Sequence, residues 1–113
     1  MPDDTNEQWQ QRIREFAPKI RDAKIAVFRS EADVKKLQAQ LELAAMANGA
    51  KTISMQKTIA DNDDSLYQAR LAVGVAKGTL SGLEIALKAV EGGFDEWRTR
   101  MASAREEKKR YGA

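Results

Sequence analysis

Two rows of mostly apolar residues, each advancing by alternating steps of four and three, constrain this chain of 113 residues most strongly. Such spacing keeps one seam of a helix turned toward a partner helix. The first row comprises Trp9, Ile13, Phe16, Ile20, Ala23, Val27, Ser30, Val34, Leu37, Leu41 and Ala44. The second row comprises Ile59, Asn62, Leu66, Ala69, Val73, Ala76, Leu80, Leu83, Leu87, Val90, Phe94, Trp97, Met101 and Ala104. The pattern predicts two long helices.

The pair Asn48-Gly49 separates the two rows. Both residue types tolerate the left-handed backbone that ends many helices. We therefore expect an all-α fold, a long antiparallel helical hairpin resembling a coiled coil, in one domain over residues 1–113. Its helix one covers about 5–47, its turn 48–51 and its helix two about 52–110. Self-association, or a C-terminal helix after Gly92-Gly93, would complete a bundle.

Local signals refine the ends of these helices. Thr5 and Gln8 form a capping-box pattern where helix one begins. Pro18 lies inside it, which predicts a kink or a short leading helix. Ser65 and Gln68 repeat the capping pattern, so helix two has a candidate break near 61–65. The heptad phase continues through this segment and favours one continuous helix.

Two further expectations concern helix two. The glycine pair at 92–93 is a second candidate break, because glycine costs roughly 1 kcal/mol per site in a helix interior. Folding the hairpin about Gly49 places Leu41 beside Ile59 and Trp9 opposite about Val90. The residues from about Trp97 onward then overhang the start of helix one.

Composition excludes several kinds of chemistry. The chain has neither cysteine nor histidine, so thiolate metal sites and every histidine-dependent catalytic arrangement are excluded. Asp61-Asn62-Asp63-Asp64 begins like a calcium loop, but Leu66 and Ala72 stand where glycine and glutamate are needed. We expect no metal, no cofactor and no enzymatic activity.

Charge and hydropathy give no sign of secretion or of a membrane-spanning segment. Lysine and arginine number 19 and aspartate and glutamate 17, for a net charge of +2, which implies no strong electrostatic steering. The first residues lack the basic and apolar regions of a secretory signal. Charged residues interrupt the most apolar stretch before it approaches the length of a membrane span. We expect a cytoplasmic protein, and peripheral membrane binding through the apolar stretch 71–90 is a third, less favoured interpretation of the chain.

The end of helix two is one candidate binding site. Tryptophan, methionine and arginine are enriched at the centres of protein interfaces. All three types occur here, and the candidate partner-binding residues are Trp97, Met101, Arg98, Arg100 and Arg105. The alternative is that this segment turns back at the glycine pair and completes the protein's own core.

A row of small residues gives a second candidate. Gly74, Gly78 and Gly82 follow one another at intervals of four, which lets two helix backbones approach closely. Leu71, Val75 and Ile85 are apolar neighbours that lie off the heptad seam. Helix two is thus apolar on more than one face, which predicts a homo-oligomer, whereas the alternative is a scatter of apolar residues on a solvated surface.

We interpret the chain as a non-enzymatic protein–protein interaction module of the adaptor or inhibitor type. Its size suits a small accessory protein of a phage or another mobile element. The alternative is a structural nucleic-acid-binding hairpin that uses the basic C-terminal end, Lys108, Lys109 and Arg110. Glu106 and Glu107 dilute that charge, and cations near a helix C-terminus are favourable in any protein.

Overall fold

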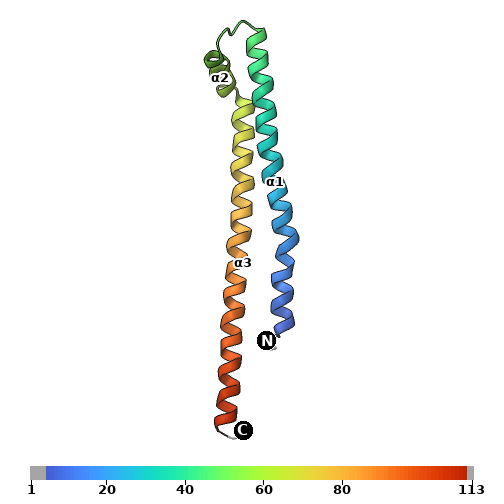
Figure 1. Ribbon diagram of the computed structural model, residues 1–113, viewed down its shortest axis with the longest axis vertical. Coiled ribbons are helices and arrows are strands. Elements are labelled where there is room, and N and C mark those ends of the chain that lie inside the picture. Colours follow the sequence, from blue (N-terminus) through green and yellow to red (C-terminus); the bar gives the residue numbers. More distant parts are fainter. Residues whose placement is uncertain (1–4, 112–113) are drawn as a thin grey trace. The chain divides into compact units, whose positions relative to one another are not determined.

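The computed structural model describes residues 5–111, which form three α-helices and no strand. Helix α1 spans Asn6–Ala47, α2 spans Ile53–Asp61 and α3 spans Asp64–Arg110 (Figure 1). The all-α class predicted from the heptad rows is confirmed. Residues 1–4, which contribute to the judgement on a secretory signal, lie outside the described residues.

By its contacts the chain divides into two compact units. The turn unit comprises Arg21–Ser81 and contains the end of α1, all of α2 and the start of α3. The terminal unit comprises the chain up to Ile20 together with the chain from Gly82 onward. Each unit therefore joins a segment of α1 to a segment of α3.

The start of α1 is fixed by the predicted capping box. The Thr5 backbone N–H donates to Gln8 Oε1 at 2.8 Å, and the Gln8 backbone N–H donates to Thr5 Oγ1 at 3.1 Å. These reciprocal bonds satisfy donors that have no partner within the helix. Helix α1 continues through Pro18 without a break, so a separate leading helix is not present in the described residues.

The end of α1 follows from Gly49. Its φ of 106° lies in the left-handed region that glycine adopts without steric cost. With the backbone reversed, the Ala50 N–H donates a hydrogen bond to the Ala45 carbonyl oxygen at 2.9 Å. The Gly49 N–H likewise donates to the Met46 carbonyl oxygen at 3.1 Å. Ala45 and Ala50 are both buried. This is a Schellman cap with its accompanying apolar contact, at the predicted position.

The preference for one continuous second helix is wrong. Helix α2 starts after Thr52, whose side chain accepts from the Met55 N–H, and it ends at Asp61. Helix α3 then begins at Asp64. The Asp63 carboxylate accepts hydrogen bonds from the Ser65 backbone N–H, at 2.8 Å, and from the Ser65 hydroxyl.

Asp63, and not the predicted Ser65, therefore caps α3. A carboxylate at this position satisfies free N–H groups and complements the helix dipole. The hydrogen bonds from Ser65 lower the pKa of Asp63 below its ordinary value. Heptad spacing is preserved across the break between α2 and α3 and therefore does not indicate it. Spacing reports which residues share a helix face, whereas the break depends on local capping by Asp63.

The second candidate break is absent. Helix α3 runs through Gly92 and Gly93 to Arg110, so within residues 5–111 no separate C-terminal helix turns back to complete a core. In this part of α3, Phe94 packs against the rings of Trp9 and Trp97. Burial of large rings contributes more than the roughly 1 kcal/mol that each glycine costs in a helix.

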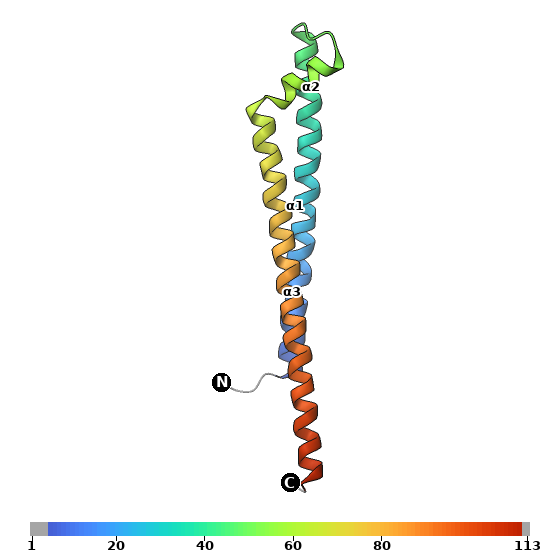
Figure 2. The ribbon, with the colours of Figure 1, turned by 90° about the vertical axis from the view of Figure 1, so that its left-hand side faces the viewer.

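The heptad seam organises burial in each unit. In the turn unit, the segments of α1 and α3 lie side by side (Figures 1 and 2), with Leu66 fully buried and Ala23 buried. The second row is buried or half-buried from Leu66 to Met101. The rows fail at their ends, where Ala44, Ile59, Asn62 and Ala104 are exposed. Near the turn Ala45 and Ala60 are buried instead, because α2 is a separate helix with its own packing face.

Candidate interaction surfaces

Three aromatic rings form a stack in the terminal unit. The ring centroids of Trp9 and Phe94 lie 6.1 Å apart, with an angle of 18° between the planes. Those of Phe94 and Trp97 lie 6.2 Å apart at 28°. Phe94 is buried and both tryptophans are half-buried. The stack joins the first turns of α1 to α3, since these offset arrangements are favourable between aromatic rings.

Gly93 allows this stack to form. A Cβ atom built there would lie 3.0 Å from Cη2 and 3.2 Å from Cζ3 of Trp9. The indole thus packs against the backbone of α3 at a position where a larger residue would displace it. The predicted partner of Trp9 was Val90, one helical turn earlier in the chain. The observed partners are Gly93 and Phe94, which lie later in the chain than Val90. The difference has this direction because the break before α3 places more residues in the connection between α1 and α3.

Arginine side chains surround the stack. The Arg12 guanidinium lies 4.7 Å from the Trp9 ring centroid, and that of Arg98 lies 5.1 Å from the Phe94 centroid. Cations over aromatic faces are attracted by the ring quadrupole. The Trp9 Nε1 atom is buried and makes no hydrogen bond.

A groove beside the stack collects part of the predicted partner-binding set. Its volume is about 320 Å³, and it is lined by Asn6, Gln10, Phe94, Trp97, Arg98 and Arg105. Arg100 instead lies in a separate hollow with Asp95, Glu96 and Thr99, and Met101 is half-buried. The structure therefore brings together Trp97, Arg98 and Arg105. The contributions of Asn6 and Gln10 were missed, because they depend on the corrected register.

The outward side of α3 in the turn unit is exposed and apolar. Val75 is 70% exposed, and Leu71 and Tyr67 are exposed as well. Cβ atoms built on Gly74 and Gly78 would meet nothing within 4 Å. In the terminal unit, Gly82 is equally open and Ile85 is exposed. We call Leu71, Gly74, Val75 and Gly78 the glycine face.

The glycine face contains no charged residue of its own, and Arg70, one helical turn before Gly74, pairs with Asp61 at 2.9 Å. Between Leu71 and Ser81 the only charged residue is Lys77. Its Nζ atom lies 3.6 Å from Oε1 of Glu31, so this lysine points toward α1 and away from the glycine face. Contiguous apolar surface of a few hundred Å² or more is typical of a site that meets another protein, so the glycine face is a candidate for one.

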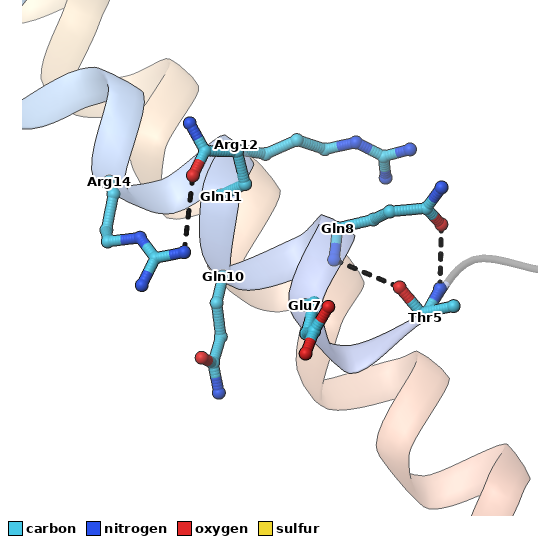
Figure 3. Close-up of a pocket in the computed structure, with 7 residues that line it drawn as sticks. All are labelled: Thr5, Glu7, Gln8, Gln10, Gln11, Arg12 and Arg14. Atoms are coloured by element: carbon cyan, nitrogen blue, oxygen red, sulfur yellow. Dashed lines mark hydrogen bonds between the residues drawn. The ribbon is translucent and has the colours of Figure 1, made fainter.

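The basic last turn of α3 and a hollow at the start of α1 are two further surface features. Lys108, Lys109 and Arg110 form the exposed last turn of α3, next to Glu106 and Glu107. An open hollow at the start of α1 is lined by seven side chains of that segment alone, among them the capping pair (Figure 3). Within it the Arg14 Nη2 donates to Gln11 Oε1 at 3.2 Å. Because one helix surface forms the whole hollow, we assign it no binding role.

Among residues 5–111, no group of three or more acidic side chains is arranged to hold a metal ion. In the same part of the chain, no helix combines the length and hydrophobicity that crossing a bilayer requires. Comparisons with models of protein families, with curated proteins and with solved structures found no match.

Proposed function

We propose that this protein is a non-enzymatic interaction module, an antiparallel helical hairpin that self-associates through the glycine face. It binds a protein partner at the groove lined by Trp97, Arg98 and Arg105, which we call the aromatic end. The observation that carries the proposal is the exposed, uncharged side of α3 in the turn unit. Val75 and Leu71 stand exposed there beside glycines whose Cβ positions open onto free space. Closure of this surface by another helix would remove apolar area from water.

A second copy is a suitable occupant of the glycine face. Two-fold symmetry brings the same patch of both chains together, so a patch must be compatible with itself. A charged patch would repel its own copy, whereas this one contains no charged residue. Glycines at intervals of four further allow two helix axes to approach, which increases the packing contacts between backbones.

The aromatic end supports binding of a different protein. Trp97, Arg98 and Arg105 share one groove, and tryptophan and arginine are among the residues that dominate the binding energy of many interfaces. An adaptor or inhibitor needs such a site in addition to its own assembly surface. An accessory protein of a phage or another mobile element would use this architecture in that way.

Substituting Val75 by glutamate tests self-association. A carboxylate at the centre of the glycine face would be repelled by its copy and would lose hydration on association. We expect Val75→Glu to lower the mass in sedimentation velocity to that of one chain, with helix content unchanged. Ala26→Glu is the matched control, because Ala26 is an exposed position of α1 in the same unit. Equal masses for Val75→Glu and the wild type would contradict the proposal.

Substituting Trp97 by alanine tests the aromatic end. We expect Trp97→Ala to abolish capture of the partner from nuclease-treated extract, because truncation empties one side of the groove. Tyr111→Ala is the control, since Tyr111 is an exposed aromatic residue of the same unit. Capture that persists in Trp97→Ala would contradict the assignment. Capture that nuclease alone abolishes would instead favour the nucleic-acid interpretation of Lys108, Lys109 and Arg110.

A further inference from the structure

The groove of the aromatic end is lined by charge of one sign. Arg98 and Arg105 are the charged side chains that line it, and among residues 5–111 no acidic residue does so. Both arginines are exposed, and neither forms an ion pair within that part of the chain. They lie seven residues apart on α3 and therefore on one side of the helix, with Cα atoms roughly 10 Å apart. Two cations thus face the same groove.

The acidic residues near this part of α3 line other hollows. Asp95 and Glu96 line one of them, and Glu106 and Glu107 line another nearer the end of the helix. Glu7 lines the hollow at the start of α1 (Figure 3). The positive charge of the groove is consequently not neutralised by carboxylates of its own lining. Electrostatic complementarity therefore favours a ligand with negative charge.

The other lining residues suit a carboxylate that lies next to an apolar side chain. The Arg98 guanidinium lies over the Phe94 ring, 5.1 Å from its centroid, and a guanidinium held in this way keeps its N–H donors available. Gln10 Nε2 donates to Asn6 Oδ1 at 3.5 Å, so the side-chain NH₂ group of Asn6 is the end that can donate to a ligand. Trp97 is half-buried and supplies an apolar wall. Clusters of arginine recognise acidic motifs through charge-assisted hydrogen bonds.

We propose that the aromatic end binds a segment of its protein partner in which acidic side chains flank an apolar one. This inference rests on the proposed function, since it names the chemistry of the partner that binds there. The carboxylates of the segment accept hydrogen bonds from Arg98 and Arg105, and its apolar side chain packs against Trp97. The bonds to arginine orient the segment as well as adding affinity.

Two other occupants fit this groove less well. A second copy related by two-fold symmetry would bring the same arginines together, and their like charges would repel. Single-stranded nucleic acid binds through many phosphate contacts and through bases stacked on aromatic faces. Phe94, however, is buried against Trp9 and Trp97 and offers no face to a base. Within residues 5–111, moreover, only two cations line the groove.

The test compares two synthetic peptides that differ only in charge. Each has two leucines at its centre, flanked on both sides by pairs of glutamate in one peptide and of glutamine in the other. The chain has two tryptophans, so the indole N–H signal of Trp97 in a heteronuclear NMR spectrum of the full chain reports on the groove. We expect the glutamate peptide to shift this signal with a Kd at least roughly tenfold lower than that of the glutamine peptide, and to bind more weakly at high salt.

Three results of this titration would overturn the proposal. Equal binding of the two peptides would remove the role of charge. A Trp97 signal that the glutamate peptide does not shift would remove the site. Tighter binding of an oligothymidylate than of the glutamate peptide would replace the acidic segment with nucleic acid.

Matched arginine substitutions on α3 locate the site. Arg105→Gln is expected to raise the Kd of the glutamate peptide by roughly tenfold, because Arg105 lines the groove. Arg100→Gln makes the same change of charge at an exposed arginine that lines a separate hollow, and it should leave the Kd nearly unchanged. Both side chains are exposed, so both variants should keep the helix content of the wild type. Equal losses in the two variants would indicate attraction to net charge alone and contradict the assignment.

Failure of this inference can be distinguished from failure of the proposed function. If Trp97→Ala abolishes capture of the partner while the two peptides bind equally, the partner site stands and its preference for an acidic segment is overturned. If capture persists in Trp97→Ala, the partner site itself is wrong and the inference fails with it.

Discussion

Replacing Leu66 by alanine is expected to lower the free energy of unfolding by about 3 kcal/mol, the middle of the range for buried leucines. Leu66 is fully buried in the turn unit, near the start of α3. Truncation removes its contacts and leaves a cavity that neighbouring helices fill only in part. Such a loss is a large fraction of the stability of a small domain. Urea denaturation followed by far-UV circular dichroism measures it.

The control for Leu66 is the same substitution at Leu43. That side chain is 61% exposed, so Leu43→Ala should cost less than about 1 kcal/mol. Both variants must be compared with the wild type at one protein concentration, because self-association adds to apparent stability. Similar losses at the two positions would show that Leu66 is not in a core of the kind described here.

Replacing Gly78 by leucine should change stability and assembly in opposite directions. Leucine is a better helix former than glycine by about 0.8 kcal/mol, and the site is open, so the helix itself should become more stable. In the assembly, the added side chain would stand between two backbones in close contact. An overpacking cost of about 1–3 kcal/mol corresponds to a dissociation constant raised by roughly fivefold to 150-fold.

The matched control is Gly78→Ala, which gains helix propensity while adding only a methyl group. We expect it to raise helix stability at low protein concentration and to weaken association less than leucine does. Thermal unfolding and sedimentation equilibrium measure the two quantities. Unaltered association in Gly78→Leu would mean that Gly78 lies outside any interface.

The sequence predicted features that depend on local chemistry or on long repetition. The capping box at Thr5 and the glycine cap at Gly49 follow from side-chain and backbone preferences that act over a few residues. The seam from Leu66 to Met101 follows from a spacing repeated over many turns. Each of these signals is present in the residues themselves and needs no knowledge of distant contacts.

Heptad spacing favours a continuous helix over the candidate break before α3, and this preference is wrong for a physical reason. Heptad phase continues through Asn62, yet Asp63 offers a carboxylate to the free N–H groups of a new helix. Because α2 is a separate helix, Ala60 is its buried packing residue and Ile59 stays exposed. The residues between Gly49 and Asp64 form the turn and α2 and do not lengthen α3. The residue of α3 that faces Trp9 therefore lies later in the chain than the predicted Val90, at Gly93 and Phe94. The groove beside the aromatic stack depends on which residues of α1 and α3 face one another, so the sequence pattern alone did not reveal it.

The central claim is that the glycine face joins copies of this chain, and the most direct test is the mass of the wild-type protein in solution. Sedimentation equilibrium over a wide range of concentrations, with Val75→Glu and Gly78→Leu alongside, measures it. We expect a wild-type mass that is a multiple of one chain, and a return toward the mass of one chain in both variants. A wild-type protein that remains a single chain at every concentration would contradict it.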